Sequence, residues 1–436
     1  MATQLPDQDA PGNGWRVLRP VVALVAVFAI QLPVGAFGLI TPFLGFGLLG
    51  LGVALRRQVP RRASILAVLW SGATLLSAVV HHDKLVTQQG MYGVVVAFAL
   101  AGLLWLHHVV GFRRETIVVI VGVGWLLLNS RHALIEGYTV NAWKYALGPP
   151  TSMIALGLAW RLRAPRLVTI AILVGIAVMS LSHDTRFLAG LSAGVALATL
   201  VHKRGQVSRA SVVRQLVVVV TAIVAVILLY PPAAQHGYFG SRAQEQQSEL
   251  SSEGLNFLFF NRPEMVQAAD IASHHLGLGI GPGSQLSSEE ANAALEHLRN
   301  MGLPLDINRR ASLLGETTAG KRGLGYATHS SALDAVVHGG LLTAPFWLYY
   351  GFLLLRMMLT RAREDVHAVP TVLWLSLLGI WDLLFSPLIA TQWTELALAL
   401  FLASTSPLVV RVSTEVPDEH TASPDDLSAP LVEAGR

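Results

Sequence analysis

The residues best placed to do chemistry surround His329, in the stretch Tyr326–Thr343 (YATHSSALDAVVHGGLLT). Here a polar segment of about a hundred residues runs back into a hydrophobic helix, so His329 falls near the outer edge of a membrane. A membrane helix needs no histidine for anchoring, and burying one costs free energy unless it has partners. A neutral imidazole can take a proton from an attacking hydroxyl. We therefore expect His329 to belong to a site at the outer face.

Two arginines are predicted to lie on the same side as this histidine. Arg186 stands in SHDTR at the entrance of a hydrophobic helix, and Arg262 opens a helix in the polar segment. Arg186 is either a functional cation or an interfacial side chain that reaches the headgroups, and Arg262 is either functional or a solvated loop charge. Guanidinium groups bind diphosphate oxygens in bidentate fashion and need no metal. Together with His329, the two cations suit chemistry on an anionic, lipid-linked substrate.

A glycine-rich turn, GLGIGPGS, follows the helix that Arg262 opens, with glycine at Gly277, Gly279, Gly281 and Gly283. No βαβ unit surrounds it, so it is not the Rossmann fingerprint. Such a turn can expose backbone N–H groups to an anion. More commonly it only lets the chain turn sharply, and both interpretations stay open at this point.

The other histidines do not predict a metal site. His274, His275 and His297 could be grouped with His329, but nothing in their spacing is typical of metal ligands, so we expect neither metal nor cofactor. His338 lies nine residues after His329, on the opposite face of a helix, and is expected to pack inside the bundle.

The composition indicates an all-α polytopic membrane protein. Of 436 residues, 53% are hydrophobic and only 13% are charged, which is too few to cover the surface of a soluble protein of this size. The chain has no cysteine, which excludes disulfides, thiolate metal sites and cysteine nucleophiles. Its basic residues stand in short clusters between apolar runs, so they indicate membrane topology and not binding to nucleic acid.

About twelve apolar runs are long enough to be transmembrane helices. Their predicted ranges are 20–36, 38–55, 63–81, 91–108, 116–130, 146–161, 167–183, 187–202, 211–230, 332–355, 369–386 and 389–410. Arginine clusters fall in alternate connections, which places those connections and both termini in the cytoplasm. Trp381 and Trp393 are then expected in an outer aromatic belt. Asp334, Asp382 and Glu395 lie in apolar runs, where they either orient a histidine or arginine or act as buried structural partners.

The predicted domain plan has five parts. It comprises a disordered cytoplasmic tail at 1–15, helices at 16–230, one large extracytoplasmic loop at 231–328, helices at 329–411 and an acidic tail at 412–436. Within the loop, Pro263 suits the first turn of a helix with Met265, Ala268, Ala269, Ala272 and His275 on one face, ending at Gly277. Ser287 or Ser288 can cap a second short helix through Leu298. A loop of this length with helical patterning favours a functional element.

Three motifs resemble those of the O-antigen ligase superfamily. His329-Ser330, nine residues, Gly340, two residues and Thr343 is similar to its motif of His, then Asn, Ser or Gln, nine residues, Gly, two residues, then Gly, Thr or Tyr. NRPEMVQAADIASHHLGLGIGPGS resembles its loop, an arginine followed by a helix and a glycine-rich turn. SHDTRFLAG resembles its helix entrance, although the commoner form is Ser-Arg. The resemblance covers roughly residues 165–360.

This resemblance implies a GT-C-like membrane glycosyltransferase of the bacterial plasma membrane, with its active site on the extracytoplasmic side. Its donor would be an undecaprenyl-diphosphate-linked glycan, and its acceptor a glycan or glycolipid. His329 would be the catalytic base, and Arg186 and Arg262 would hold the diphosphate. The residues implied to contact the substrate are Ser330, Gly279, Gly281, Gly283, His275 and Gly340.

Three functions stay open on the sequence. The first is an O-antigen ligase-like transfer of a preassembled glycan to an acceptor hydroxyl. The second is a polysaccharide polymerase, which uses the same donor chemistry with a lipid-linked glycan as acceptor. The third is a flippase for lipid-linked oligosaccharides, which predicts duplicated halves and a charged central cavity, and the sequence shows no internal repeat.

Overall fold

A computed structural model of the chain is predominantly helical in the part that it describes. That part comprises residues 13–32, 41–82, 88–136, 142–183, 185–201, 232–238, 263–282, 288–300, 330–360, 365–386 and 392–406, with single positions at 213, 217, 221, 244 and 248. No strand occurs in these residues. The all-α prediction is confirmed for them.

The helices follow the predicted apolar runs closely. The first group is α1 (Asn13–Gln31), α2 (Phe43–Arg56), α3 (Gln58–Val80), α4 (Gln88–His108), α5 (Arg114–Glu136), the π-helical turn η1 (Trp143–Leu147), α6 (Gly148–Arg161), α7 (Arg166–Ser182) and α8 (Arg186–Val201). The second group is α12 (Pro263–His274), α13 (Ser288–Asn300), α15 (Ser331–Gly339), the 3-10 turn η3 (Leu341–Thr343), α16 (Ala344–Thr360), α17 (Val369–Phe385) and α18 (Trp393–Thr405). Several begin at or just after a proline, which lacks the N–H that a first turn leaves unpaired.

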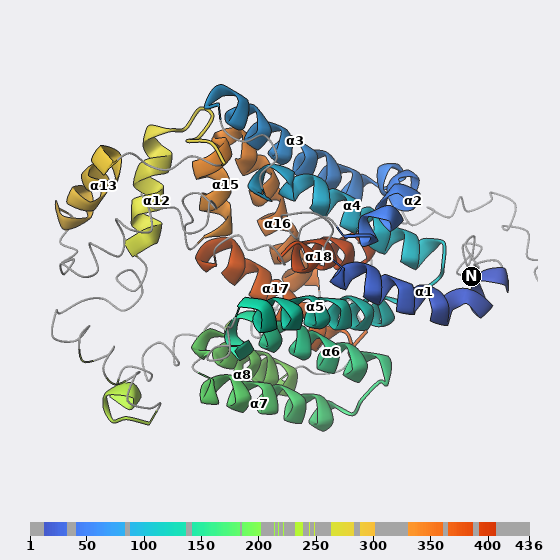
Figure 1. The fold of residues 1–436 in the computed structure, drawn as a ribbon. Coiled ribbons are helices and arrows are strands. Elements are labelled where there is room, and N and C mark those ends of the chain that lie inside the picture. The colour runs from blue at the N-terminus through green and yellow to red at the C-terminus, as the bar shows by residue number, and fades with distance from the viewer. Residues whose placement is uncertain are drawn as a thin grey trace, which may run out of the picture.

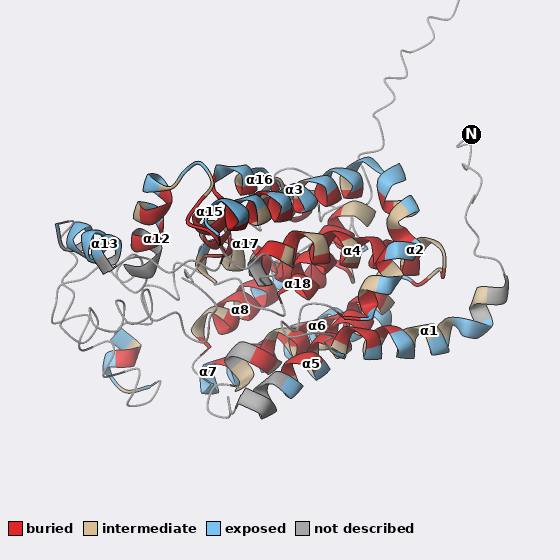
Figure 2. Cartoon of the chain, turned by 45° about the horizontal axis from the view of Figure 1, so that its top comes forward, coloured by how far each residue is buried: buried red, intermediate tan, exposed pale blue. Residues whose placement is uncertain are grey.

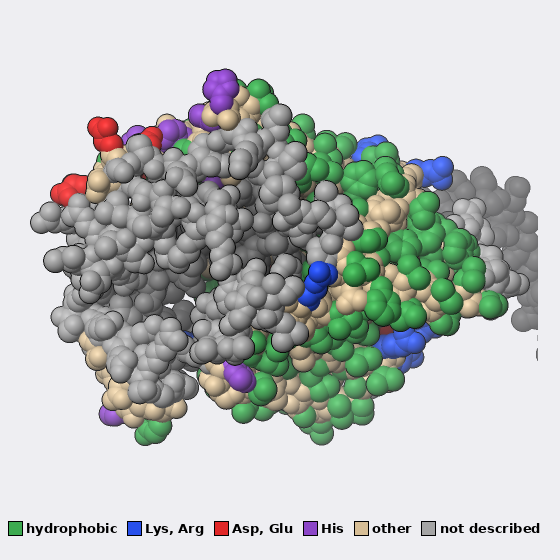
Figure 3. Space-filling view, viewed as in Figure 1, with side chains coloured by type: hydrophobic (Ala, Val, Ile, Leu, Met, Phe, Trp, Pro, Cys, Tyr) green, Lys and Arg blue, Asp and Glu red, His purple; other side chains and the backbone are tan. Residues whose placement is uncertain are grey.

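The helices of the main body lie side by side, with α4 and α18 at the centre (Figures 1 and 2). Aromatic rings join α3 to α16, where Trp70 stacks on Phe346 at 5.1 Å and meets the edge of Trp347 at 5.0 Å. The outward faces of α3 and α7 are apolar, with exposed side chains such as Leu69 and Val178, and apolar atoms cover much of the surface in Figure 3. Such faces fit a lipid environment and not water.

Three helical segments are long and apolar enough to cross a membrane, namely Gln58–Val80, Gly90–His108 and Leu341–Thr360. Six further apolar helices in the described residues are shorter, among them α2, α7, α8, α17 and α18. The helical prediction is thus confirmed in its coarse form, whereas the count of twelve spans stays a prediction. The predicted ninth span, 211–230, lies outside the described residues apart from three single positions, and so do residues 1–12 and the tail 412–436. The last residues of the predicted tail 1–15 are helical, because α1 begins at Asn13.

The arginine-rich connections meet at one end of the bundle. Arg57 hydrogen-bonds His108 at 3.4 Å, and Arg161 donates to Thr116 at 2.7 Å. The Arg114 guanidinium lies 5.3 Å from the centre of the Trp160 ring. The loop helices α12 and α13 lie at the opposite end (Figure 1), where Figure 3 also shows the visible carboxylates. The arginine clusters of the alternate connections therefore lie at the end of the bundle that is far from α12 and α13.

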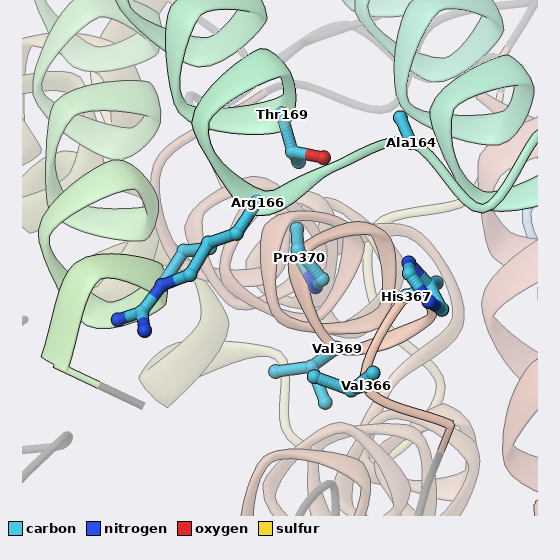
Figure 4. A pocket seen from close by; sticks show the side chains of 8 residues that line it. Ala164, Arg166, Thr169, Val366, His367, Val369 and Pro370 are labelled. Carbon is cyan, nitrogen blue, oxygen red and sulfur yellow. The ribbon is translucent and has the colours of Figure 1, made fainter. Parts of the chain in front are cut away.

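One cavity, of about 280 Å³, opens at the arginine-rich end. It is lined by Ala164, Arg166, Thr169, Thr199, Val366, His367, Val369 and Pro370 (Figure 4). The Arg166 side chain points away from it, because its guanidinium donates to the carbonyl of Leu200. The lining therefore lacks an inward-facing cation, and we assign the cavity no role.

Two predictions of the sequence analysis are wrong. The segment 332–355 is not one helix, because Gly340 has φ 71° and separates α15 from η3 and α16. A side chain at Gly340 would place its Cβ 2.1 Å from the carbonyl oxygen of Gly277, so the close approach of another segment explains the break. Trp393 does not lie in an outer belt, since it is only 1% exposed and packs against Phe43 of α2.

We expect Gly340→Ala to lower the free energy of unfolding by about 1–3 kcal/mol, because the left-handed backbone is strained for alanine and the Gly277 carbonyl must move. Gly72→Ala on α3 is the matched control, since its Cβ meets no atom within 4 Å, and it should raise the free energy by up to about 1 kcal/mol. Denaturation in detergent measures both. Equal stability of the two variants would contradict the proposed clash.

Candidate functional site

The structure describes some of the predicted site residues and not others. Arg186, His275, Gly279, Gly281, Ser330 and Gly340 are described, whereas His329, Arg262 and Gly283 lie outside the described residues. In the sequence, however, Arg262 directly precedes α12, and His329 directly precedes the cap of α15. The positions of these helix starts therefore define the candidate site.

The start of α15 is fastened to the end of α17. Ser330 caps α15, since its hydroxyl oxygen accepts from the N–H of Leu333 at 3.3 Å. The same hydroxyl donates to the carbonyl of Leu383 at 2.9 Å. The Ser331 hydroxyl lies 2.9 Å from the carbonyl oxygen of Ser386. The chain directly after His329 is thus held by side-chain bonds to one neighbouring helix end.

The same end of α17 also contacts the start of α8. Trp381 stacks on Phe187 with ring centroids 3.8 Å apart and an interplanar angle of 13°, and Phe385 lies 4.7 Å from Trp381. Phe187 follows Arg186, the first residue of α8. The structure therefore brings the start of α8, which Arg186 opens, and the residue after His329 to the same helix end, although 144 positions separate Arg186 from Ser330 in the sequence.

The loop helix α12 packs along α15. Ala268, Ile271 and Ala272 form a small apolar core with Val337 and Ile280. Of the face predicted for this helix, Ala268 and Ala272 are buried, but Ala269 is exposed. The chain directly after α12 is hydrogen-bonded to the last turn of α15. The C-terminal ends of the two packed helices are therefore adjacent, so both helices run in the same direction and begin at the same end (Figure 1).

The glycine-rich turn is the clamp between these two helices. The N–H of Ile280 donates to the carbonyl of Val337 at 2.8 Å, and that of Gly281 donates to His338 at 3.2 Å. The N–H of Gly279 donates back to His275 at 3.0 Å. Since these amides are already bonded, Gly279 and Gly281 offer no free N–H to an anion here. Their positive φ values, 72° and 94°, fit the sharp-turn interpretation instead.

Two histidines, the buried His338 and the exposed His81, also bond to this turn. His338, 1% exposed, donates from Nδ1 to the carbonyl of Gly281 at 2.9 Å. His81, at the end of α3, reaches the carbonyl of Gly279 with Nε2 at 3.0 Å. A carbonyl can only accept, so each of these nitrogens carries its proton. The prediction that His338 packs inside is confirmed.

His275 connects α12 to the second loop helix. Its Nε2 lies 3.3 Å from a carboxylate oxygen of Glu290 on α13, and His297 of α13 lies 4.0 Å from Asp270 on α12. The predicted substrate contact of His275 stays a prediction. Within the described residues no three His, Asp or Glu side chains gather as potential metal ligands.

The sequence analysis missed several polar residues beside the candidate site. Gln392, Ser331 and Ser386 surround Asp382 and Glu395, at the junction of α15, α17 and α18. The available signal was the string of polar residues around Trp393 (TQWTE) in an otherwise apolar run.

Chemically, the arrangement favours an anion. The starts of α8, α12 and α15 lie at one end of the bundle, and each helix start carries about half a positive charge. Arg186 opens the first of these helices, and Arg262 precedes the second in the sequence.

Comparison of the chain with protein-family models and with curated proteins finds no match.

We predict that the Phe187–Trp381 stack couples α8 to α17. A double-mutant cycle of Phe187→Ala and Trp381→Ala should give a coupling free energy of about 0.5–1.5 kcal/mol, because offset-stacked rings gain beyond their buried area. Unfolding in detergent measures it. The pair Tyr349 and Phe352, with centroids 6.3 Å apart on one helix, should couple more weakly. A Phe187–Trp381 coupling near zero would contradict the role assigned to the stack.

Proposed function

We propose that this chain is a membrane glycosyltransferase that moves a preassembled glycan from undecaprenyl diphosphate to an acceptor hydroxyl. The observation that carries the proposal is the meeting of the starts of α8 and α15 at the end of α17, with α12 packed alongside α15. These starts lie opposite the arginine-rich end (Figure 1). They are the helices that Arg186, Arg262 and His329 open or directly precede in the sequence.

In the proposed reaction, His329 removes the proton from the acceptor hydroxyl as its oxygen bonds to the anomeric carbon. The bond from that carbon to the diphosphate oxygen breaks, and undecaprenyl diphosphate leaves with the electron pair. Arg186 and Arg262 stabilise the charge of the leaving group, which is worth about 2.7–4 kcal/mol for each well-placed donor. Neighbouring guanidinium groups also favour the neutral form of the histidine, as a base requires.

The membrane setting belongs to the same proposal. We place the arginine-rich end and both termini in the bacterial cytoplasm, by the positive-inside rule. The site then lies on the extracytoplasmic side, where residues 231–328 form the large loop. The proposed count of about twelve spans combines the described helices with the apolar run 211–230.

We expect His329→Ala, Arg186→Ala and Arg262→Ala each to lower transfer by about 100-fold or more, because a positioned base or oxyanion donor contributes at least that much. The assay measures release of undecaprenyl diphosphate from glycan-linked donor in nanodiscs. His274→Ala and Arg131→Ala are matched controls, since both residues are exposed helix positions outside the proposed machinery, and they should keep wild-type rates. Full activity of His329→Ala would overturn the base.

The product distinguishes the acceptor classes in the same assay. A single addition supports the ligase-like reaction, whereas a ladder of products identifies a polysaccharide polymerase. Movement of glycan across the bilayer with no release of undecaprenyl diphosphate would replace the proposal by a flippase.

Transfer should proceed unchanged with EDTA in the assay, because guanidinium groups can neutralise a diphosphate without a metal. The measurement is the initial rate before and after chelation, followed by addition of Mg²⁺ or Mn²⁺. Loss of the rate on chelation and its return with either ion would show that a metal takes part.

A further inference from the structure

A chain of buried and partly buried polar side chains runs from the start of α15 to α17 and α18. The Ser331 hydroxyl lies 3.2 Å from Gln392 Oε1 on α18. Gln392 and the Ser386 hydroxyl both hydrogen-bond the Asp382 carboxyl group on α17. Asp382 in turn is hydrogen-bonded to Glu395 of α18. We call these five residues the carboxyl network.

Burying the polar groups of the carboxyl network among apolar helices costs free energy. Ser331, Gln392 and Glu395 are at most 3% exposed, and they sit among apolar helices. Glu395 Oε1 has no hydrogen-bond partner among the described residues, and such an atom costs free energy that an apolar side chain would avoid. Packing alone is served as well or better by apolar residues of similar size. Ionisable groups inside a membrane bundle therefore indicate function.

The carboxyl network ends at the residues that follow His329. Ser331 is the first residue of α15, and the adjacent Ser330 caps that helix while bonded to Leu383 of α17. The position and rotation of the first turn of α15 are thus set by side chains of α17 and α18. His329 lies two residues before Ser331 in the sequence.

We propose that Asp382, Gln392 and Glu395 are positioning residues that fix the first turn of α15, and through it His329, for glycan transfer. This inference rests on the proposed function. It predicts a loss in the chemical step and not in substrate binding, because the carboxyl network acts on the direction of the base. A misplacement of about 1 Å can cost about 100-fold in rate.

The substitutions at Asp382 separate hydrogen bonding from packing. Asp382→Asn keeps an oxygen that accepts from Ser386 and gains an N–H₂ that can donate to Glu395. Asp382→Leu keeps the branched shape of the side chain, with bulkier methyl groups in place of the oxygens, but removes every bond. Ser376→Ala is the matched control, because Ser376 is a buried serine of the same helix whose hydroxyl bonds only the carbonyl of Val372, at 2.7 Å, in its own helix.

We expect Asp382→Leu to lower kcat by about 10- to 100-fold while KM changes by less than about twofold. The kcat of Asp382→Asn should stay within about threefold of the wild-type value, and the kcat of Ser376→Ala should equal the wild-type value. Gln392→Leu is the second variant where Asp382→Leu fails to fold, with the same expected loss. Equal rates for Asp382→Leu and Asp382→Asn would overturn the proposal.

A double-mutant test shows whether the carboxyl network acts through the histidine. In a His329→Ala background, Asp382→Leu should lower the residual transfer rate by less than about twofold, since there is no base left to position. A further 10-fold or larger loss would assign the network a role independent of His329 and overturn the proposal.

Hydrogen exchange tests the anchoring without any activity. Amides of residues 330–339 should exchange faster in Asp382→Leu than in wild type and Ser376→Ala. Unchanged exchange would overturn the proposal even where transfer is lost. If wild type shows no transfer, the proposed function fails, and faster exchange then leaves only the anchoring of α15 standing.

Discussion

The close approach of two glycine-bearing segments holds the loop against the bundle. Residues 277–281 run so near to residues 337–341 that a Cβ at Gly279 or Gly340 would lie under 2.5 Å from a backbone oxygen of the other segment. Only glycine permits such contact together with positive φ. The contact stops α15 at Gly340 and docks the turn after α12. Without it, α12 would be held beside α15 by their small apolar core alone.

A second constraint is that α17 serves as a common anchor. Its C-terminal end is bonded to Ser330 and Ser331 of α15, stacks on Phe187 of α8 and joins α18 through Asp382. From α4, Tyr92 adds hydrogen bonds to the backbone at Gln392 and Trp393. Segments that are far apart in the sequence therefore meet at one helix end. This explains how arginines and a histidine separated by long stretches of chain can belong to one site.

Much of the fold could be predicted because membrane helices carry their signal locally. Apolar length and bounding arginines or prolines give the helices from α2 to α8 to within a few residues. The helix that begins at Pro263 could be predicted equally well, since the proline marks its start and the apolar pattern marks its buried face. The start of α13 at Ser288 also matches its predicted cap.

What the sequence could not give depends on contacts between distant segments. The apolar run 332–355 has no local feature that outweighs helix formation except Gly339-Gly340, and it breaks because Gly277 approaches Gly340. Trp393 resembles a belt residue in the sequence, yet neighbouring helices bury it completely. The roles of Gly279 and Gly281 were open for the same reason. Whether a turn amide binds a ligand or another backbone segment depends on which segment packs against the turn. In this chain that segment is the end of α15, almost 60 residues later in the sequence.

The placement of polar groups gives the strongest physical argument for where function lies. At the arginine-rich end the cations contact neighbouring side chains and carbonyls near the surface, such as Arg161 with Thr116. At the other end Glu395 is buried beside the partly buried Asp382, and one glutamate oxygen lacks a partner among the described residues. Replacing both carboxyl groups together by well-packed apolar side chains is commonly neutral or stabilising, whereas removing one of them leaves the other without its partner. The free-energy cost of these polar groups is located beside the first turn of α15. At this position a small displacement of the chain would have the largest effect on the proposed site.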